Sequence, residues 1–130
     1  MSLARMRAAA ILAGGAAGAL ARGGVAEALP REPGQWPWAT FSVNLAGTLL
    51  LAWLTTRLTE VVVPTRYWRF LLGTGFSGAL TTFSTFQVET IELVREGYVA
   101  LAIAYAVTSI AAGMLLAVAA TVAARRRRYG

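Results

Sequence analysis

Residues 73–86 read GTGFSGALTTFSTF, and this stretch decides how the chain is expected to fold. It places Gly73, Gly75 and Gly78 beside six hydroxyl side chains, inside an apolar run from about Tyr67 to Val94. Backbone groups that lose their helical partners in a bilayer cost several kcal/mol each unless protein or water satisfies them. The stretch predicts either a helix broken near mid-membrane, with its hydroxyls satisfying freed groups, or a glycine-rich packing face on an intact helix.

Three further apolar runs surround this one, at about Met6–Leu29, Trp38–Leu58 and Tyr98–Ala124. Each is long enough for a transmembrane helix, which needs about 20 apolar residues. The first run also has the features of a signal peptide, with Ala19-Leu20-Ala21 as a cleavage-like site, but three spans follow it. The sequence therefore predicts an all-α membrane protein with four transmembrane helices, forming a single four-helix transmembrane domain over residues 1–130.

The charged residues narrow the chemistry. The chain has twelve basic and six acidic residues, all of them Arg and Glu, and it contains no His and no Cys. Metal sites built from Cys or His, imidazole bases, thiol nucleophiles and disulfides are therefore excluded, and we expect no enzyme. The excess of basic residues does not indicate nucleic-acid binding, because arginines that flank membrane helices determine how those helices are oriented in the membrane.

The arginines also predict an orientation. Nine of the twelve flank one side of the predicted membrane and three flank the other. The positive-inside rule then places both termini in the cytoplasm, in a multi-pass protein of the plasma (inner) membrane. Much of the bias comes from the tail Arg125–Arg128, since without it the split is five to three.

Neutral polar and aromatic side chains are the candidates for an ion path. Phe83 and Phe86 share a helical face, where they either pack against apolar neighbours or present weakly positive ring edges to an anion. Asn44 either bonds to another helix or donates its amide to an ion. Its face includes Thr40 and Thr48, four residues away on either side.

The fourth and first spans add two more candidates. Tyr105 and Ser109 are four residues apart and form a comparable polar stripe. Such neutral donors suit an anion that must lose its water and still leave readily. Arg22 either sets the electrostatics of an aqueous vestibule or extends to the membrane boundary.

The sequence resembles the Fluc (CrcB) fluoride ion channel family. The resemblance rests on residues 14–22 (GGAAGALAR), 40–48 (TFSVNLAGT) and above all 75–86 (GFSGALTTFSTF), and it extends over all four runs. It implies passive export of fluoride through an antiparallel dimer with two narrow paths and a broken third helix. It assigns the path to Asn44, Phe83, Phe86, Thr82, Thr85 and Ser109, with Arg22 as the vestibule arginine.

The same resemblance implies a structural sodium ion at the dimer interface, held by the backbone carbonyls of Gly78 and Thr81. Many family members have Tyr after the first-span arginine, where this chain has Gly23, so the wall there is expected to differ. The partner is either a second copy inserted with dual topology or an oppositely oriented paralogue, which the arginine asymmetry favours.

The expected role is protection from fluoride. Hydrogen fluoride crosses membranes as a neutral acid and dissociates in the less acidic interior, where fluoride is trapped; a passive channel lets the interior-negative potential drive it out. There are two alternative functions: a small multidrug-resistance-type proton-coupled transporter, which needs a carboxylate within the membrane, and a structural membrane subunit. The first run has no carboxylate before Glu27, and Glu89 and Glu92 are expected near the exit of the third run.

Overall fold

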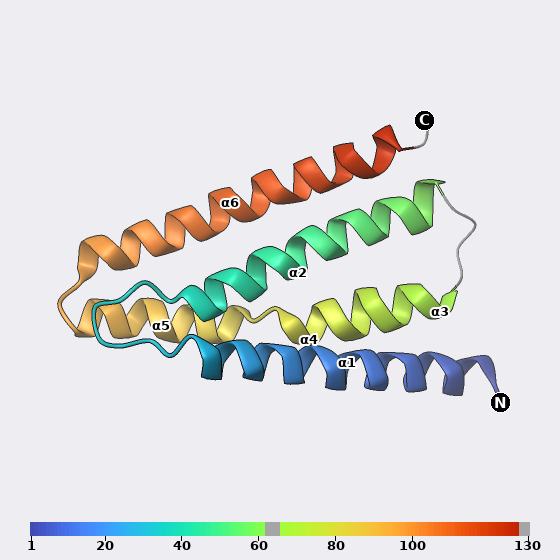
Figure 1. Ribbon diagram of the computed structural model, residues 1–130, viewed down its shortest axis with the longest axis horizontal. Helices are drawn as coiled ribbons and strands as arrows, with labels where there is room; N and C mark the ends of the chain where they lie inside the picture. Colours follow the sequence, from blue (N-terminus) through green and yellow to red (C-terminus); the bar gives the residue numbers. More distant parts are fainter. Residues whose placement is uncertain (62–65, 128–130) are drawn as a thin grey trace.

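A computed structural model describes residues 1–61 and 66–127 of the chain, so Arg128 of the predicted basic tail lies outside the described residues. The described residues form helices and contain no strand. Figure 1 shows the helices running along one common direction, with both termini at the same end of the molecule. In chain order they are α1 (Leu3–Ala28), α2 (Trp38–Thr56), η1 (Arg57–Val61), α3 (Arg66–Trp68), η2 (Arg69–Ser77), α4 (Gly78–Leu80), α5 (Phe83–Arg95) and α6 (Val99–Arg126), where η marks wide, π-type turns.

Three helices in the described part of the chain are long and apolar enough to cross a membrane: α1, α2 continued to Glu60, and α6. The predicted run Tyr67–Val94 is not one continuous helix. Its first part ends with α4 at Leu80, and its second part, α5, begins at Phe83. The sequence therefore supplies four apolar runs, but the third is divided into two shorter helical pieces.

The interruption consists of two extended residues. Thr81 has φ −81° and ψ 150°, and Thr82 has φ −147° and ψ 117°. Gly78, by contrast, keeps helical angles, with φ −63° and ψ −38°. The threonines, and not the glycines, therefore leave the helical conformation.

The glycines serve close packing between α1 and the helix that precedes the interruption. A Cβ at Gly14 would lie 1.9 Å from the Leu71 carbonyl oxygen, and one at Gly18 would lie 2.3 Å from that of Phe76. Such approaches are possible only without side chains, as expected for a GxxxG motif. Gly14 and Gly18 therefore bring the two helix backbones into close contact.

A small core lies at the end of the bundle opposite the termini, where α5 turns into α6. Leu93, Ala102 and Tyr105 are fully buried, and Trp36 and Phe41 pack against them. The indole of Trp36 meets the Tyr105 ring edge-on at a centroid distance of 5.5 Å. This core fixes α5 against α2 and α6, and so fixes the position of the interruption at the start of α5.

Candidate ion pathway

Asn44 holds the interrupted backbone in place. Its Nδ2 donates to the Thr82 carbonyl at 3.0 Å, and its Oδ1 accepts from the Thr82 N–H at 2.7 Å. The side-chain amide thus pairs with both the N–H and the carbonyl of one extended residue, as a neighbouring β-strand would. Of the two roles considered for Asn44, the structure contains the bond to another helix, and this bond satisfies two backbone groups that the interruption exposes.

Two further backbone groups lose their helical donors at the same place. In a continued helix the Thr82 N–H would donate to the Gly78 carbonyl, but it donates to Asn44. The Thr85 N–H would likewise donate to the Thr81 carbonyl, but it donates to Thr82 Oγ1 at 3.2 Å, which caps the start of α5. Gly78 and Thr81 therefore carry carbonyls whose helical partners are diverted, and Gly78 faces open space.

One side of the interruption opens into a hollow of about 320 Å³, which we call the aromatic hollow. The Phe83 and Phe86 rings are stacked there, with centroids 5.9 Å apart and planes inclined by 25°. Phe83 is 70% exposed, so one of its faces has no cover from the described chain. The hollow is lined by Asn44, Gly47, Thr48, Leu51, Thr81, Thr82, Phe83, Phe86, Ser109 and Ile110.

Ser109 contributes an unsatisfied hydroxyl to the aromatic hollow. Its Oγ is buried and has no hydrogen-bond partner among the described residues. Most helical hydroxyls here do have one, as Thr121 does with the Ala117 carbonyl at 2.8 Å. A buried polar atom without a partner is costly, so this hydroxyl is placed to bind water or an ion in the hollow.

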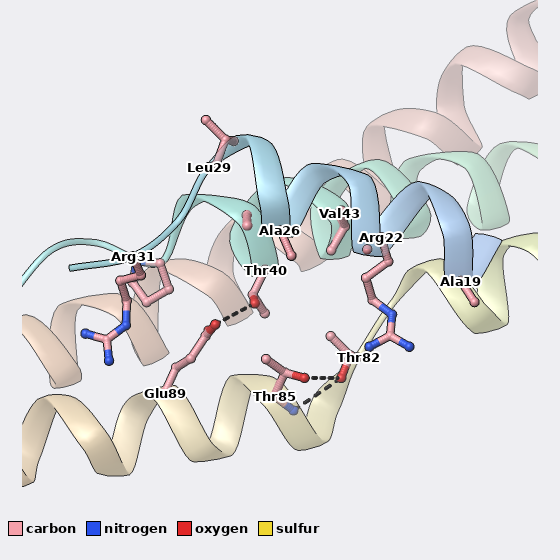
Figure 2. A pocket seen from close by; sticks show the side chains of 13 residues that line it. Ala19, Arg22, Ala26, Leu29, Arg31, Thr40, Val43, Thr82, Thr85 and Glu89 are labelled. Carbon is pink, nitrogen blue, oxygen red and sulfur yellow. Dashed lines mark hydrogen bonds between the residues drawn. The ribbon is translucent and has the colours of Figure 1, made fainter. Parts of the chain in front are cut away.

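The other side of the interruption opens into a second hollow of about 390 Å³, the vestibule hollow (Figure 2). Arg22 reaches into it from α1, and its Nε donates to the Ala79 carbonyl at 3.0 Å. Thr82 and Thr85 line the opposite wall, with their hydroxyls 3.0 Å apart. Gly23, which also lines this hollow, has no atom within 4 Å of where a Cβ would lie, so the missing side chain widens it.

The contacts of Glu89 were not predicted from the sequence, which placed this residue toward the exit of the third run. Its half-buried carboxylate lines the vestibule hollow. It accepts a hydrogen bond from the Thr40 hydroxyl at 2.7 Å and another from the Tyr105 hydroxyl at 2.9 Å. The spacing Thr82, Thr85, Glu89 is a helical stripe, and that signal was available in the sequence.

The predicted path residues therefore divide between the two hollows. The aromatic hollow holds Asn44, Phe83, Phe86 and Ser109, and the vestibule hollow holds Arg22, Thr40 and Thr85. Thr82 lines both. Tyr105 lines neither, since it is fully buried and reaches the vestibule only through Glu89.

A cluster of charges closes the outer end of the vestibule hollow. Arg31, from the loop between α1 and α2, bonds Glu92 at 2.8 Å and both carboxylate oxygens of Glu96 at 3.1 and 3.2 Å. The Gly34 N–H also donates to Glu96. The guanidinium lowers the pKa of the Glu96 carboxyl, and that hydrogen bond in turn raises the pKa of Arg31. The loop is thus tied to the end of α5.

Comparison with known proteins gives a consistent result. Residues 9–121 match the family described as CrcB-like protein, Camphor Resistance (CrcB). Two proteins named fluoride-specific ion channel FluC 1, from Mycobacterium bovis and Mycobacterium tuberculosis, are 51% identical over 120 residues, which cover 92% of this chain and 91% of theirs. A protein of the same name from Mycolicibacterium paratuberculosis is 49% identical over the same length.

Proposed function

Since this chain belongs to the CrcB family, whose relatives are fluoride-specific ion channels, we propose that it carries fluoride passively out of the cytoplasm and so lowers its toxicity. It is a multi-pass membrane protein and a channel, not an enzyme. We propose that the ion passes from the vestibule hollow to the aromatic hollow beside Thr82, which lines both. That shared residue, next to interrupted main chain, is the observation that carries the proposed path.

The two hollows suit successive tasks in conduction. The vestibule hollow also contains the Glu89 carboxylate, but the positive charge of Arg22, bonded to the Ala79 carbonyl, attracts anions to the part of the hollow near the interruption. The aromatic hollow offers the Ser109 hydroxyl and the rings of Phe83 and Phe86, which are neutral. Neutral donors and positive ring edges stabilise a small anion without holding it tightly, so the anion leaves as readily as it enters.

We propose that a sodium ion binds at the carbonyls of Gly78 and Thr81. Carbonyl oxygens suit a hard cation, and these two have lost their helical donors to Asn44 and Thr82. Gly78 lies at an exposed position with open space around it, so a second subunit can supply further oxygens. When bound, the ion would neutralise the freed carbonyl dipoles and hold two interruptions together.

We further propose an antiparallel dimer with four spans in each subunit, in which the divided run Tyr67–Val94 is the third. The exposed face of Phe83 and the open surface at Gly78 need cover that the described chain does not supply. The arginines favour one fixed insertion, with both termini in the cytoplasm, and therefore an oppositely oriented paralogue as the partner. A dual-topology homodimer is the competing arrangement.

The orientation is tested with a tag at the C-terminus, assayed from both faces of the membrane. Fixed insertion predicts that the tag is accessible from the cytoplasmic face only. Signal from both faces would establish the dual-topology homodimer instead. Either result is compatible with fluoride conduction, so the proposed orientation and the proposed conduction can be contradicted independently of each other.

Conduction is tested by reconstituting the purified chain, alone and with a coexpressed oppositely oriented paralogue, into liposomes loaded with fluoride or with chloride. We expect rapid release of fluoride and retention of chloride when the membrane potential is collapsed by a potassium ionophore. If neither preparation releases fluoride, the chain is a structural subunit. If release requires a proton gradient, the chain is a coupled transporter.

A further inference from the structure

An apolar groove of about 410 Å³ lies between α2 and α6, apart from both hollows. Its walls are Leu49, Leu50 and Trp53 on α2, and Ala119, Ala120 and Ala123 on α6. Its volume falls within the range of about 300–1,000 Å³ that is usual for small-molecule sites. The three alanines create the space, because larger side chains there would fill it.

The groove faces away from the proposed dimer surface. Trp53 follows Asn44 by nine residues, which is about two and a half helical turns, so the two lie on opposite sides of α2. Asn44 faces the aromatic hollow beside the exposed Phe83. A partner that covers Phe83 therefore leaves the groove open to lipid.

A guanidinium stands at one end of the groove. The Arg57 Cζ lies 5.8 Å from the centre of the Trp53 ring, and its Nη1 donates to the Ala124 carbonyl at 3.5 Å. These contacts hold the charged group beside Trp53 and Ala124, with most of its N–H groups unused by the described residues. Tryptophan and arginine at a helix end are typical of the level of lipid head groups.

The surrounding charge is positive. Arg57 caps the end of α2, and Figure 1 shows that α2 ends at the same end of the bundle where α1 begins and α6 ends. Arg126 and Arg127, at the end of α6, have no ion-pair partner in residues 1–61 and 66–127, whereas Arg125 is paired with Glu60 at 2.7 Å. A ligand with an anionic head and an apolar tail complements this combination of unpaired arginines and dry groove.

We propose that the groove between α2 and α6 is a binding site for an anionic phospholipid. One acyl chain lies along Leu49, Leu50 and the alanines of α6, with Trp53 at its upper end. The phosphate accepts hydrogen bonds from Arg57, whose planar guanidinium suits phosphate oxygens. This site does not depend on fluoride conduction, because it shares no residue with either hollow.

The test uses the fluorescence of Trp53 in nanodiscs. Phosphatidylglycerol or phosphatidylcholine with a brominated acyl chain quenches nearby indoles, and the Trp53 signal is obtained by subtracting a Trp53→Phe variant from the wild type. We expect half-maximal quenching of Trp53 at about fivefold lower mole fraction of the brominated anionic lipid than of the zwitterionic one. Arg57→Gln should remove this preference.

Arg7 provides a matched control at the same end of the molecule. Its guanidinium also lies over an aromatic ring, that of Phe70 at 5.3 Å, but Phe70 is not a wall of the groove, whereas Trp53 is. Arg7→Gln should therefore preserve the preference. Ala119→Leu and Ala123→Leu, at two exposed positions, should fill the groove and weaken quenching by both lipids.

Three results would overturn the proposal. Equal quenching by the two lipids would show an unselective lipid surface. Equal loss of preference in Arg57→Gln and Arg7→Gln would show attraction to the whole basic end. Protection of Trp53 from both lipids would show that protein, such as a second copy, covers the groove.

Discussion

The vestibule hollow and the aromatic hollow share Thr82 but differ in how their polar groups are satisfied. In the vestibule hollow every charged side chain that the sequence analysis considered is engaged, since Arg22 bonds Ala79 and Glu89 bonds Thr40 and Tyr105. In the aromatic hollow the Ser109 hydroxyl is unsatisfied and Phe83 is uncovered. The charged groups of the vestibule hollow thus find partners within one chain, whereas the Ser109 hydroxyl and the exposed face of Phe83 do not find them in the described residues.

We propose that the two hollows have different roles in conduction. A site whose groups are already paired binds a passing ion weakly and serves for entry. A site with an unpaired donor and uncovered ring edges interacts with the ion directly, at the point where it sheds water. We therefore expect substitutions in the aromatic hollow to change conduction most, and those outside both hollows to change it least.

The largest effect is expected at Asn44, which fixes the extended main chain of Thr82, the residue that lines both hollows. Asn44→Ala leaves the Thr82 N–H and carbonyl without partners, at a cost of about 1–3 kcal/mol for each buried group. We expect both loss of fluoride efflux and a lower thermal unfolding midpoint in detergent. Thr48→Ala, in the same hollow, keeps both bonds and should be close to wild type in stability. An Asn44→Ala protein as stable as wild type would contradict this role.

A smaller loss is expected when the aromatic surface is removed. Phe83→Ile preserves apolar volume but eliminates the positive ring edge, so fluoride efflux should fall about tenfold with little change in unfolding. Phe70→Ile, at the other end of the same run, is the matched control and should conduct normally. Equal rates for the two variants would show that Phe83 only contacts lipid or core.

Substitution of Ser109 is expected to change fluoride conduction without changing stability. Its hydroxyl has no partner in the described chain, so Ser109→Ala should leave the unfolding midpoint unchanged. Loss of one donor to the ion should reduce fluoride efflux by about two- to tenfold. In the control Thr121→Ala, a hydroxyl that bonds its own helix is lost, and efflux should not change. Wild-type efflux in Ser109→Ala would remove Ser109 from the path.

The smallest effect concerns the charge cluster outside the hollows. The pKa of Glu96 is held below its ordinary value of 4.5 by its hydrogen bonds with Arg31, so the cluster stabilises the loop above that pH. As the pH falls through the lowered pKa, the carboxylate takes up a proton and that contribution is lost. Hydrogen exchange at the Gly34 N–H, corrected for intrinsic rates, should therefore lose protection in acid.

The control for this pH dependence is Glu32, whose carboxylate has no ion pair with Arg31 in the described part of the chain. Glu96→Gln should abolish the pH dependence of Gly34 exchange, and Glu32→Gln should preserve it. Fluoride efflux near neutral pH should be nearly unchanged in both variants. Unaltered pH dependence in Glu96→Gln would show that other groups control the loop.

The structure brings Asn44, Phe83, Phe86 and Ser109 together around one hollow. Helical spacing alone left a packing or helix-bonding role open for Asn44, Phe83 and Phe86, and the family resemblance is what assigns all four to an ion path. The cause of the interruption was harder to predict, because glycine and threonine were interleaved between positions 73 and 86. The two readings of that stretch turn out to apply to different residues: its glycines pack against α1 or stay helical, and the threonines are extended.

The position of Glu89 shows what periodicity alone did not reveal. Counted along an unbroken span it falls near the membrane exit, but the capped start of α5 at Phe83 turns the Thr82, Thr85, Glu89 stripe toward α2. Its partners Thr40 and Tyr105 come from two other helices, and their meeting depends on tertiary packing. The sequence predicts where Glu89 lies along the third run, but its hydrogen-bond partners on other helices could be identified only from the structure.

We propose that ions pass from one hollow to the other beside Thr82. Because the chain has no native cysteine, single cysteines introduced along this path can be tested for block of fluoride efflux. Thr40→Cys places a thiol in the vestibule region and Ser109→Cys in the aromatic hollow, while Val107→Cys lies on the exposed face of α6. Silver ion should stop fluoride efflux from liposomes in the first two variants and spare the third. Undiminished efflux from Thr40→Cys and Ser109→Cys with one silver bound per thiol would contradict the proposed path.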